Sequence, residues 1–311
     1  MSLIRSNFFQ EIIAHPYNEG RRRLEVISGY SSPSFLFNLL SSFDELQIDL
    51  TIGMAKEDSI SSWNHIQYQD LVHEFSDRLT VKYYYGEPPV HSKIYYWDGD
   101  LANPEIAFIG SGNLTRNGFS NYNEVFSSVN PDDIRAAMEY ADVIDCTDDD
   151  VNDIIGFGYS NGGREIDTSA VGRIVQNHPR VDLMLTETHD SRQVHSRSGL
   201  NWGHREGRER NQAYIPAPRR VHTSNPGFFP PRRQVFNIIT DDGESFACVM
   251  AQENSKAIES CYDNSIIGRY FRRRLGLSDG EFITIDHLDS YGRSFVTLYK
   301  IDEETYFMDF S

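Results

Sequence analysis

The order of strand-like and helix-like segments constrains the fold more than any other feature of this sequence. Across the first 130 residues, segments with the alternating apolar pattern of strands are interleaved with helix-like segments. The strand-like segments then cluster, which favours a mixed α/β sheet. A small, polar stretch at 160–172 is typical of a linker. Beyond it short strands dominate, and they favour a mostly-β, barrel-like domain.

The segments behind these two predictions have the following bounds. In the first half, strands are predicted at 23–30, 47–54, 78–86, 90–97, 105–112 and 123–129, and helices at 31–43 and 60–76. In the second half, strands are predicted at 180–188, 213–218, 235–240, 245–250, 295–301 and 305–310, and one helix at 265–277. No internal repeat is visible, so one copy of each domain is expected.

Length and composition fit two globular domains. With 311 residues the chain is long enough for two ordinary cores, which we place at 1–175 and 176–311. No apolar stretch approaches the roughly 18 residues that span a bilayer, and the first ten residues lack a secretory signal pattern. The three cysteines form no CxxC, so neither a disulfide framework nor a zinc site is predicted. We therefore expect a soluble, cytoplasmic protein.

The net charge of −17 argues against binding to nucleic acid, because phosphates repel acidic surfaces. The charge is unevenly spread, however. Residues 192–233 hold nine arginines and two acids, a net charge of +7 that leaves −24 on the rest of the chain. Because the local sign matters more than the total, this window is either a nucleic-acid-binding surface or an exposed, solvated loop. We interpret the acidic run at 132–153 as a solvated helix face or loop.

Polar side chains interrupt the apolar pattern of the strand predicted at 90–97. Side chains two residues apart in a strand share a face, so His91 and Lys93 are expected to point the same way. An ordinary structural role stays open for single residues here. His91 fits a hydrogen-bonded core histidine, and Asp98 fits a turn that follows the strand.

A second group of polar residues follows the strand predicted at 105–112. The turn Gly110–Gly112 is a place where backbone can approach a ligand closely. Asn113 and Thr115 lie where a helix could begin, and a helix N-terminus presents free N–H groups to an anion. Glu124 lies at the head of the next predicted strand. A histidine, a lysine, an amide and free N–H groups that converge on one spot suit a phosphate.

This combination resembles the HKD motif of the phospholipase D superfamily. A bare His-x-Lys is uninformative, but the added residues, all in strand-like context, make the pattern specific. The matching residues are His91-x-Lys93-x4-Asp98, then Gly110-Ser111-x-Asn113, then Glu124.

The resemblance implies a division of roles in phosphodiester cleavage. His91 is the expected nucleophile, which attacks phosphorus and forms a covalent phosphohistidine. Lys93, Asn113 and Ser111 are expected to hold the non-bridging oxygens, whose charge rises in the transition state. Glu124 is expected to bind the far imidazole nitrogen and to fix its tautomer. No metal ion or other cofactor is implied.

The sequence contains one HKD motif, whereas a second histidine must protonate the leaving group. Members of the superfamily with a single motif obtain that histidine by dimerising about a two-fold axis. The resemblance therefore implies a homodimer with one active site shared between two nuclease domains.

The segment 198–218 places aromatic, arginine and amide side chains just before and into a predicted strand: Trp202, Arg205, Arg208, Arg210, Asn211 and Tyr214. Together with 235–260, 266–277 and 290–311, it resembles the C-terminal portion of the NgoFVII-type restriction endonucleases, relatives of BfiI. The resemblance implies a phospholipase D-like nuclease domain at 1–175 and a B-three-like pseudobarrel at 176–311 that recognises double-stranded DNA. The six residues are its expected DNA contacts.

In pseudobarrels of this kind, two loops enter the major groove. By position, the loop between the strands at 180–188 and 213–218 is the expected N-terminal arm. The loop after the strand at 245–250 is the expected C-terminal arm, with Gln252, Asn254 and Lys256 as DNA contacts. Arginine suits guanine, while asparagine and glutamine suit adenine. The arginines at 272–274 are expected to contact backbone or acids instead.

These features predict a site-specific, metal-independent restriction endonuclease that cleaves DNA through a phosphohistidine. Two alternatives stay open. One is a sequence-specific DNA-binding protein with an inactive phospholipase D-like domain. The other is a lipid phosphodiesterase, which the lack of an amphipathic membrane segment or signal disfavours. A cognate methyltransferase and a separate ATP-driven translocase subunit stay open as further partners, and no membrane partner is expected.

Overall fold

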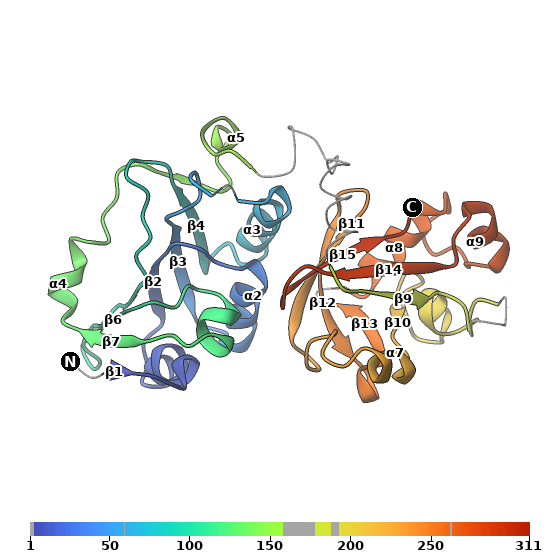
Figure 1. Ribbon diagram of the computed structural model, residues 1–311, viewed down its shortest axis with the longest axis horizontal. Coiled ribbons are helices and arrows are strands. Elements are labelled where there is room, and N and C mark those ends of the chain that lie inside the picture. The colour runs from blue at the N-terminus through green and yellow to red at the C-terminus, as the bar shows by residue number, and fades with distance from the viewer. Residues whose placement is uncertain (1–2, 59, 158–177, 188–192, 262) are drawn as a thin grey trace. The chain divides into compact units, whose positions relative to one another are not determined.

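The computed structural model describes residues 3–58, 60–157, 178–187, 193–261 and 263–311 (Figure 1). The chain divides into two compact units, Met1–Gly162 and Gly163–Ser311, each with its own hydrophobic core. The domain boundary predicted between 175 and 176 falls outside the described residues. No helix in the described part of the chain combines the length and apolar character that a membrane crossing requires.

The first unit contains an eight-stranded mixed sheet, which confirms the predicted α/β class. Its strand order is β1-β7-β6-β5-β2-β3-β4-β8. β2, β3 and β4 run parallel, and all other neighbours are antiparallel. The strands are β1 (Leu3–Ile4), β2 (Arg23–Ser28), β3 (Gln47–Ile52), β4 (Leu79–Tyr84), β5 (Ile94–Trp97), β6 (Ile106–Gly110), β7 (Phe126–Val129) and β8 (Val143–Asp145).

Helices α2 and α3 lie along one face of this sheet (Figure 1). Apolar residues that alternate along the central strands, such as Leu24 and Leu50, pack with the helices in one core. Ser32 begins α2, because its side chain accepts a hydrogen bond of 3.2 Å from the N–H of Phe35. The helical elements are η1 (Phe9–Ala14), α1 (His15–Asn18), α2 (Pro33–Ser42), α3 (Ser62–Glu74), η2 (Asn117–Asn121), α4 (Pro131–Arg135) and α5 (Val151–Ile154).

The second unit contains a seven-stranded sheet in the order β10-β13-β12-β11-β15-β14-β9. β9 and β10, its two ends, also contact each other, so the sheet is nearly closed, as the predicted barrel-like domain requires. The strands are β9 (Arg180–Met184), β10 (Ile215–Pro216), β11 (Val235–Thr240), β12 (Ser245–Ala251), β13 (Ala257–Ser260), β14 (Phe295–Lys300) and β15 (Thr305–Asp309). The helices are η3 (Gly199–His204), α7 (Arg219–Ser224), η4 (Glu253–Ser255), α8 (Ser265–Arg274) and α9 (Ile285–Tyr291).

Two predicted elements near the polar residues begin later than expected. β5 begins at Ile94 and not at residue 90, since Pro88 and Pro89, just upstream, have no N–H for a ladder. The helix predicted to begin at Asn113 or Thr115 is replaced by the short η2, which starts at Asn117. Before it, the Thr115 hydroxyl accepts a hydrogen bond of 3.1 Å from the N–H of Gly118. His91, Lys93 and Asn113 therefore lie on irregular segments at the ends of strands.

Arg272 of α8 lies inside the second unit, with no exposed surface. Its guanidinium donates to the carbonyl oxygens of Glu281 (2.8 Å), Gly268 (3.1 Å), Arg210 (3.2 Å) and Asn211 (3.4 Å). Burial lowers the pKa of Arg272. One side chain thus satisfies four backbone acceptors and ties two loops to the helix.

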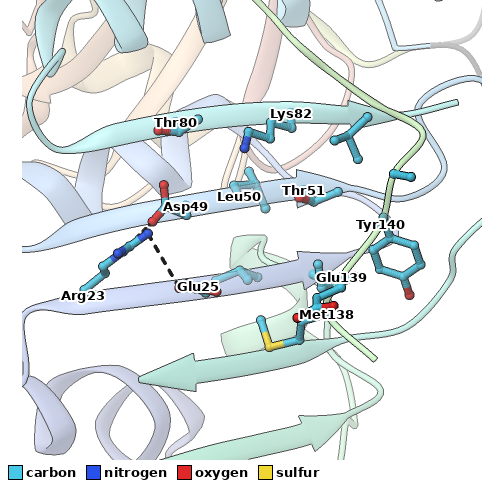
Figure 2. A pocket seen from close by; sticks show the side chains of 14 residues that line it. Arg23, Glu25, Asp49, Leu50, Thr51, Thr80, Lys82, Met138, Glu139 and Tyr140 are labelled. Atoms are coloured by element: carbon cyan, nitrogen blue, oxygen red, sulfur yellow. Dashed lines mark hydrogen bonds and ion pairs between the residues drawn. The ribbon is translucent and has the colours of Figure 1, made fainter. Parts of the chain in front are cut away.

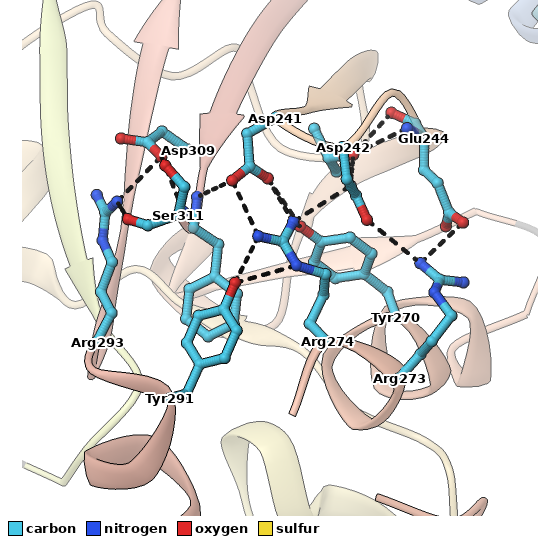
Figure 3. Close-up of polar contacts among 12 residues, drawn as sticks. Asp241, Asp242, Glu244, Tyr270, Arg273, Arg274, Tyr291, Arg293, Asp309 and Ser311 are labelled. Atoms are coloured by element: carbon cyan, nitrogen blue, oxygen red, sulfur yellow. Dashed lines mark hydrogen bonds and ion pairs between the residues drawn. The ribbon is translucent and has the colours of Figure 1, made fainter. Parts of the chain in front are cut away.

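The next two arginines of α8 contact acids (Figure 3). Arg274 donates to both carboxylate oxygens of Asp241, at 2.5 and 3.0 Å, and to the Tyr291 hydroxyl. Arg273 is half-exposed and lies 2.8 Å from the Glu244 carboxylate. Arg273 and Arg274 therefore contact acids, as expected, whereas Arg272 contacts carbonyl oxygens of the protein itself.

Arg272→Ala is expected to lower the free energy of unfolding by about 2–4 kcal/mol, because four backbone carbonyls lose this donor and two of the hydrogen bonds are buried. Arg273→Ala is the matched control, with an expected loss below about 1 kcal/mol, since its ion pair is exposed to solvent. Calorimetry of the full chain measures both losses. Equal losses in the two variants would contradict the role given to Arg272.

Candidate active site

Strand pairing brings four chain segments together at one end of the first sheet. β5 is antiparallel to β2, so the start of β5 lies beside the end of β2. β6 is antiparallel to β5 and β7 to β6, which adds the end of β6 and the start of β7. The candidate residues at 91–93, 111–113 and 124 flank these strand ends. Those at 91–93 and 113 therefore gather around residues 28–29, where β2 ends.

Gly29 lies at the centre of this group. A Cβ atom built on Gly29 would be 3.0 Å from His91 Cδ2, 3.4 Å from Asn113 Oδ1 and 3.4 Å from Lys93 Nζ. Three side chains from two different loops thus converge on one point. The space between them exists because residue 29 has no side chain.

His91 is exposed, while Lys93 is buried. The Lys93 ammonium lies 3.0 Å from Nδ1 and 3.1 Å from Nε2 of His91, and it donates to the His91 carbonyl oxygen at 2.6 Å. Burial lowers the pKa of Lys93, and the negative charge of Glu124 opposes this shift. The site therefore combines an accessible imidazole with a partly desolvated cation.

Backbone contacts fix the segment that contains His91. The N–H of Val90 donates to the carbonyl oxygen of Gly53 at 3.1 Å, and the N–H of Gly110 donates to that of Lys93 at 3.2 Å. A Cβ atom on Gly53 would lie 2.0 Å from the Val90 carbonyl oxygen, so only glycine permits this approach. His91 is thus held between the ends of β3 and β6.

Asn113 is oriented by the residues that end β2. Its Oδ1 accepts hydrogen bonds from the Tyr30 N–H at 3.2 Å and from the Ser28 hydroxyl at 3.3 Å. Ser28 Oγ in turn accepts from the N–H of Leu114 at 3.0 Å. Within the described residues, Asn113 Nδ2 donates to no partner, so this amide donor is available to a ligand.

Ser111 and Glu124 form a pair beside this group. The Ser111 hydroxyl donates a short hydrogen bond to the Glu124 carboxylate and accepts one of 3.1 Å from the N–H of Val125. In the described part of the chain, Glu124 forms no hydrogen bond to His91, although the resemblance implies one. Glu124 bonds Ser111 instead, and its negative charge favours the charged form of Lys93.

Asp98 lies at the far end of β5, so four strand residues separate it from Lys93. It pairs with Arg23 at 3.7 Å, and the same arginine bonds Asp49 at 2.7 Å. Arg23, Glu25 and Asp49 line a cavity of about 590 Å³ over β2, β3 and β4 (Figure 2). None of the predicted catalytic residues lines this cavity. Among the described residues, no group of three or more His, Cys, Asp or Glu side chains is arranged to hold a metal ion.

Sequence reasoning missed Ser28, Gly29, Tyr30 and Gly53, although all four help to position the site. The sequence contains a weak signal for Gly29 and Gly53. Each glycine lies near the end of a strand-like segment, in "SGY" and in "IGM". In α/β sheets, ligands bind outside the carboxyl ends of parallel strands, so a glycine there is informative. The pattern alone did not show which strands are neighbours.

Two of the predicted DNA-contacting residues in the second unit, Trp202 and Asn211, are buried. Trp202 is 7% exposed, with Tyr214 edge-on at 5.4 Å and the Arg208 guanidinium 3.6 Å from its ring centroid. Asn211 is 4% exposed, and its Oδ1 accepts from the N–H of Gly280 at 2.7 Å. Both residues therefore help to support the loop, and their contact with DNA stays a prediction.

The remaining candidates lie at the surface of two loops. Arg205, Arg208 and Arg210 are exposed in the turn that follows η3. In the loop between β12 and β13, Asn254 and Lys256 are exposed, whereas Gln252 donates to Glu259 at 2.9 Å. Tyr214 is half-buried. Part of the predicted N-terminal arm, residues 188–192, lies outside the described residues.

Two family models match the chain, and together they cover both units. Residues 6–155 match the NgoFVII restriction endonuclease N-terminal PLD domain, and residues 174–302 match the NgoFVII C-terminal B3-like DNA-binding domain. The protein is thus a DNA nuclease with a phospholipase D-like domain and a B3-like domain. The chain belongs to the NgoFVII restriction endonuclease family.

Three solved structures have some similarity to parts of this chain. Nuc, a phospholipase D family member from Salmonella typhimurium, is 11% identical (TM-score 0.33), over 46% of this chain and 97% of that chain. NucT from Helicobacter pylori is 16% identical (TM-score 0.29), over 44% and 89%. Polyphosphate kinase from Porphyromonas gingivalis is 15% identical (TM-score 0.33), over 56% and 28%. No curated protein matches the sequence.

Gly29→Ala is expected to abolish DNA cleavage, because the added methyl group would contact His91 and occupy the space between Lys93 and Asn113. Specific DNA binding, which belongs to the other domain, is expected to persist in a gel-shift assay. Gly156→Ala is the matched control in the same unit, since a Cβ there meets no atom within 4 Å. Normal cleavage by Gly29→Ala would show that the reacting phosphate lies elsewhere.

Proposed function

We propose that the protein is a site-specific restriction endonuclease that cleaves DNA through a covalent phosphohistidine on His91 and needs no divalent metal. The convergence of His91, Lys93 and Asn113 on Gly29 is the observation that supports this most directly. These side chains supply a nucleophile, a cation and an amide donor within a few ångströms of one point. A phosphodiester placed there meets every group that the reaction requires from one subunit.

The first step forms the intermediate. The imidazole lone pair of His91 attacks phosphorus and a P–N bond forms, while the P–O bond to the leaving oxygen breaks. The protonated His91 of the partner subunit gives its proton to that oxygen. In the second step water attacks phosphorus, the P–N bond breaks, and the partner's imidazole takes the water proton. The two imidazoles thus begin the cycle in different charge states.

Positive charge and oriented donors stabilise the transition state. The Lys93 ammonium and Asn113 lie beside Gly29. In this proposal the ammonium and the free Asn113 Nδ2 hold the non-bridging oxygens. Ser111, fixed by Glu124, is the third proposed contact to these oxygens. Glu124 also favours the charged form of Lys93. Because the protein supplies this charge, no step assigns a role to a metal ion.

A second copy of the chain completes the site in this proposal. The chain has one HKD motif, so the second histidine comes from the partner in a homodimer, with one active site shared about the two-fold axis. The B3-like domain selects the sequence, with the exposed Arg205, Arg208 and Arg210 as the first candidates for base contacts. A translocase subunit and a cognate methyltransferase stay predictions.

His91→Ala is expected to abolish cleavage of plasmid DNA while specific binding is retained, because the substitution removes the nucleophile from a domain that does not read sequence. Wild-type cleavage is expected to continue in excess EDTA, since Lys93 and a protonated imidazole supply the positive charge. Sequencing the ends of the cut plasmid gives the target site. Cleavage that stops in EDTA and resumes with magnesium would rule out this mechanism.

Wild type and His91→Ala also test whether the active site is shared between two subunits. Light scattering is expected to give the mass of a dimer for wild type and for His91→Ala alike. A monomer that cleaves DNA would contradict a site built from two subunits.

The burial of Lys93 predicts the alkaline side of the pH profile. Because its pKa is lowered, the ammonium is lost at a lower pH than the value of about 10.4 for an exposed lysine. Single-turnover cleavage is therefore expected to lose the contribution of Lys93 as pH rises through that lowered pKa. This decrease adds to the one caused when the partner's imidazole loses the proton that the first step requires. Lys93→Arg keeps its charge at high pH, so the decrease should move to higher pH. Lys82→Arg, on the opposite sheet face, is the control and should leave the profile unchanged.

A further inference from the structure

A second cavity, of about 260 Å³, adjoins the candidate active site. Gly29 lines it, and Gly29 is also the residue on which His91, Lys93 and Asn113 converge. Tyr30 also lines the cavity. Its ring lies edge-on to the His91 ring, with 5.8 Å between the ring centroids. The cavity therefore begins beside the position proposed for the reacting phosphate.

The lining of this cavity combines aromatic, apolar and hydrogen-bonding groups. Tyr30, Met54 and Ile60 offer apolar surface, while Asp58 and Asn64 offer polar atoms. The Tyr30 hydroxyl donates a short hydrogen bond to Asp58 Oδ2, which raises the pKa of Tyr30 to about 12. The phenol thus stays protonated, and the bond holds its ring against one wall.

The charge of the lining and the volume of the cavity restrict the class of ligand that can bind there. Of the described residues that line the cavity, only Asp58 has a charged side chain. Its carboxylate repels phosphate, so a phosphate group is disfavoured as the ligand. The volume is below the range of about 300–1,000 Å³ typical of sites for drug-sized ligands. A single planar ring system that carries hydrogen-bond donors fits this chemistry. A nucleobase is such a group, since every base can stack on an aromatic side chain.

We propose that this cavity is a subsite for the base of the nucleotide joined to the scissile phosphate, turned out of the DNA stack. The proposal rests on the proposed function, because it needs a phosphodiester at His91. Asp58 Oδ1 accepts from an exocyclic amino group, so adenine, cytosine or guanine is favoured over thymine. Asn64, in the first turn of α3, donates and accepts at the base edge. Flipped bases in other enzymes are bound by the same kinds of contact.

Asn64→Trp tests the subsite by filling it from α3. The measurement is single-turnover cleavage of the target duplex, and of two duplexes in which an abasic residue replaces the nucleotide on one or the other side of the scissile phosphate. Asn64→Trp is expected to cut the intact duplex about 5- to 100-fold more slowly than wild type. On one abasic duplex the two proteins are expected to agree within about twofold, because no base needs the cavity.

His73→Trp, on the exposed side of the same helix, is the control and should cut all three duplexes like wild type. Equal rates for Asn64→Trp and wild type on the intact duplex would overturn the subsite. So would a slowing that persists on both abasic duplexes, since that marks a general defect. If Asn64→Trp no longer binds target DNA, the cleavage rates of Asn64→Ala on the same three duplexes are compared with those of wild type, and the same outcomes apply. If wild type cuts no duplex at all, the proposed function fails rather than the subsite alone.

Discussion

The antiparallel pairing of β5 with β2 on one side and β6 on the other is the constraint on which the candidate active site depends. It places the end of β2, the start of β5 and the end of β6 together, although these segments are far apart in sequence. Their loops then meet at Gly29, where the absence of a side chain leaves room for a ligand. A register shift of one residue would turn alternate side chains to the opposite face and separate the group.

In the second unit, the arginines of α8 and those of the turn after η3 make different kinds of contact. Those of α8 satisfy carbonyl oxygens and carboxylates, so their charge is used inside the domain. Those of the turn after η3 are exposed at the surface, where they can meet phosphates and bases. Arg272 links the two groups, because it bonds the backbone of Arg210 and Asn211. The exposed arginines at 205–210 thus lie on a turn that is held from inside the domain.

The sequence was sufficient for the two fold classes, because periodicity and segment order report directly on strands, helices and their alternation. It was also sufficient to predict that His91, Lys93 and Asn113 lie together, because they share one motif. The expected bond from Glu124 to His91 is not formed among the described residues, and Glu124 bonds Ser111 instead. It did not reveal Gly29, whose importance depends on which strands are neighbours. Nor did it separate Trp202 from the exposed arginines. An aromatic ring among arginines fits a base-stacking surface and a buried support equally well, and only burial distinguishes the two.

The stacking of Arg208 on Trp202 has a thermodynamic consequence. A free arginine side chain samples many rotamers, and fixing them costs up to about 2 kcal/mol. Here the guanidinium already lies 3.6 Å from the indole centroid and donates to Gln212 at 2.8 Å. Much of that entropy is therefore lost during folding, before any ligand arrives. A contact made by Arg208 then begins from an ordered side chain, which favours affinity without enlarging the interface.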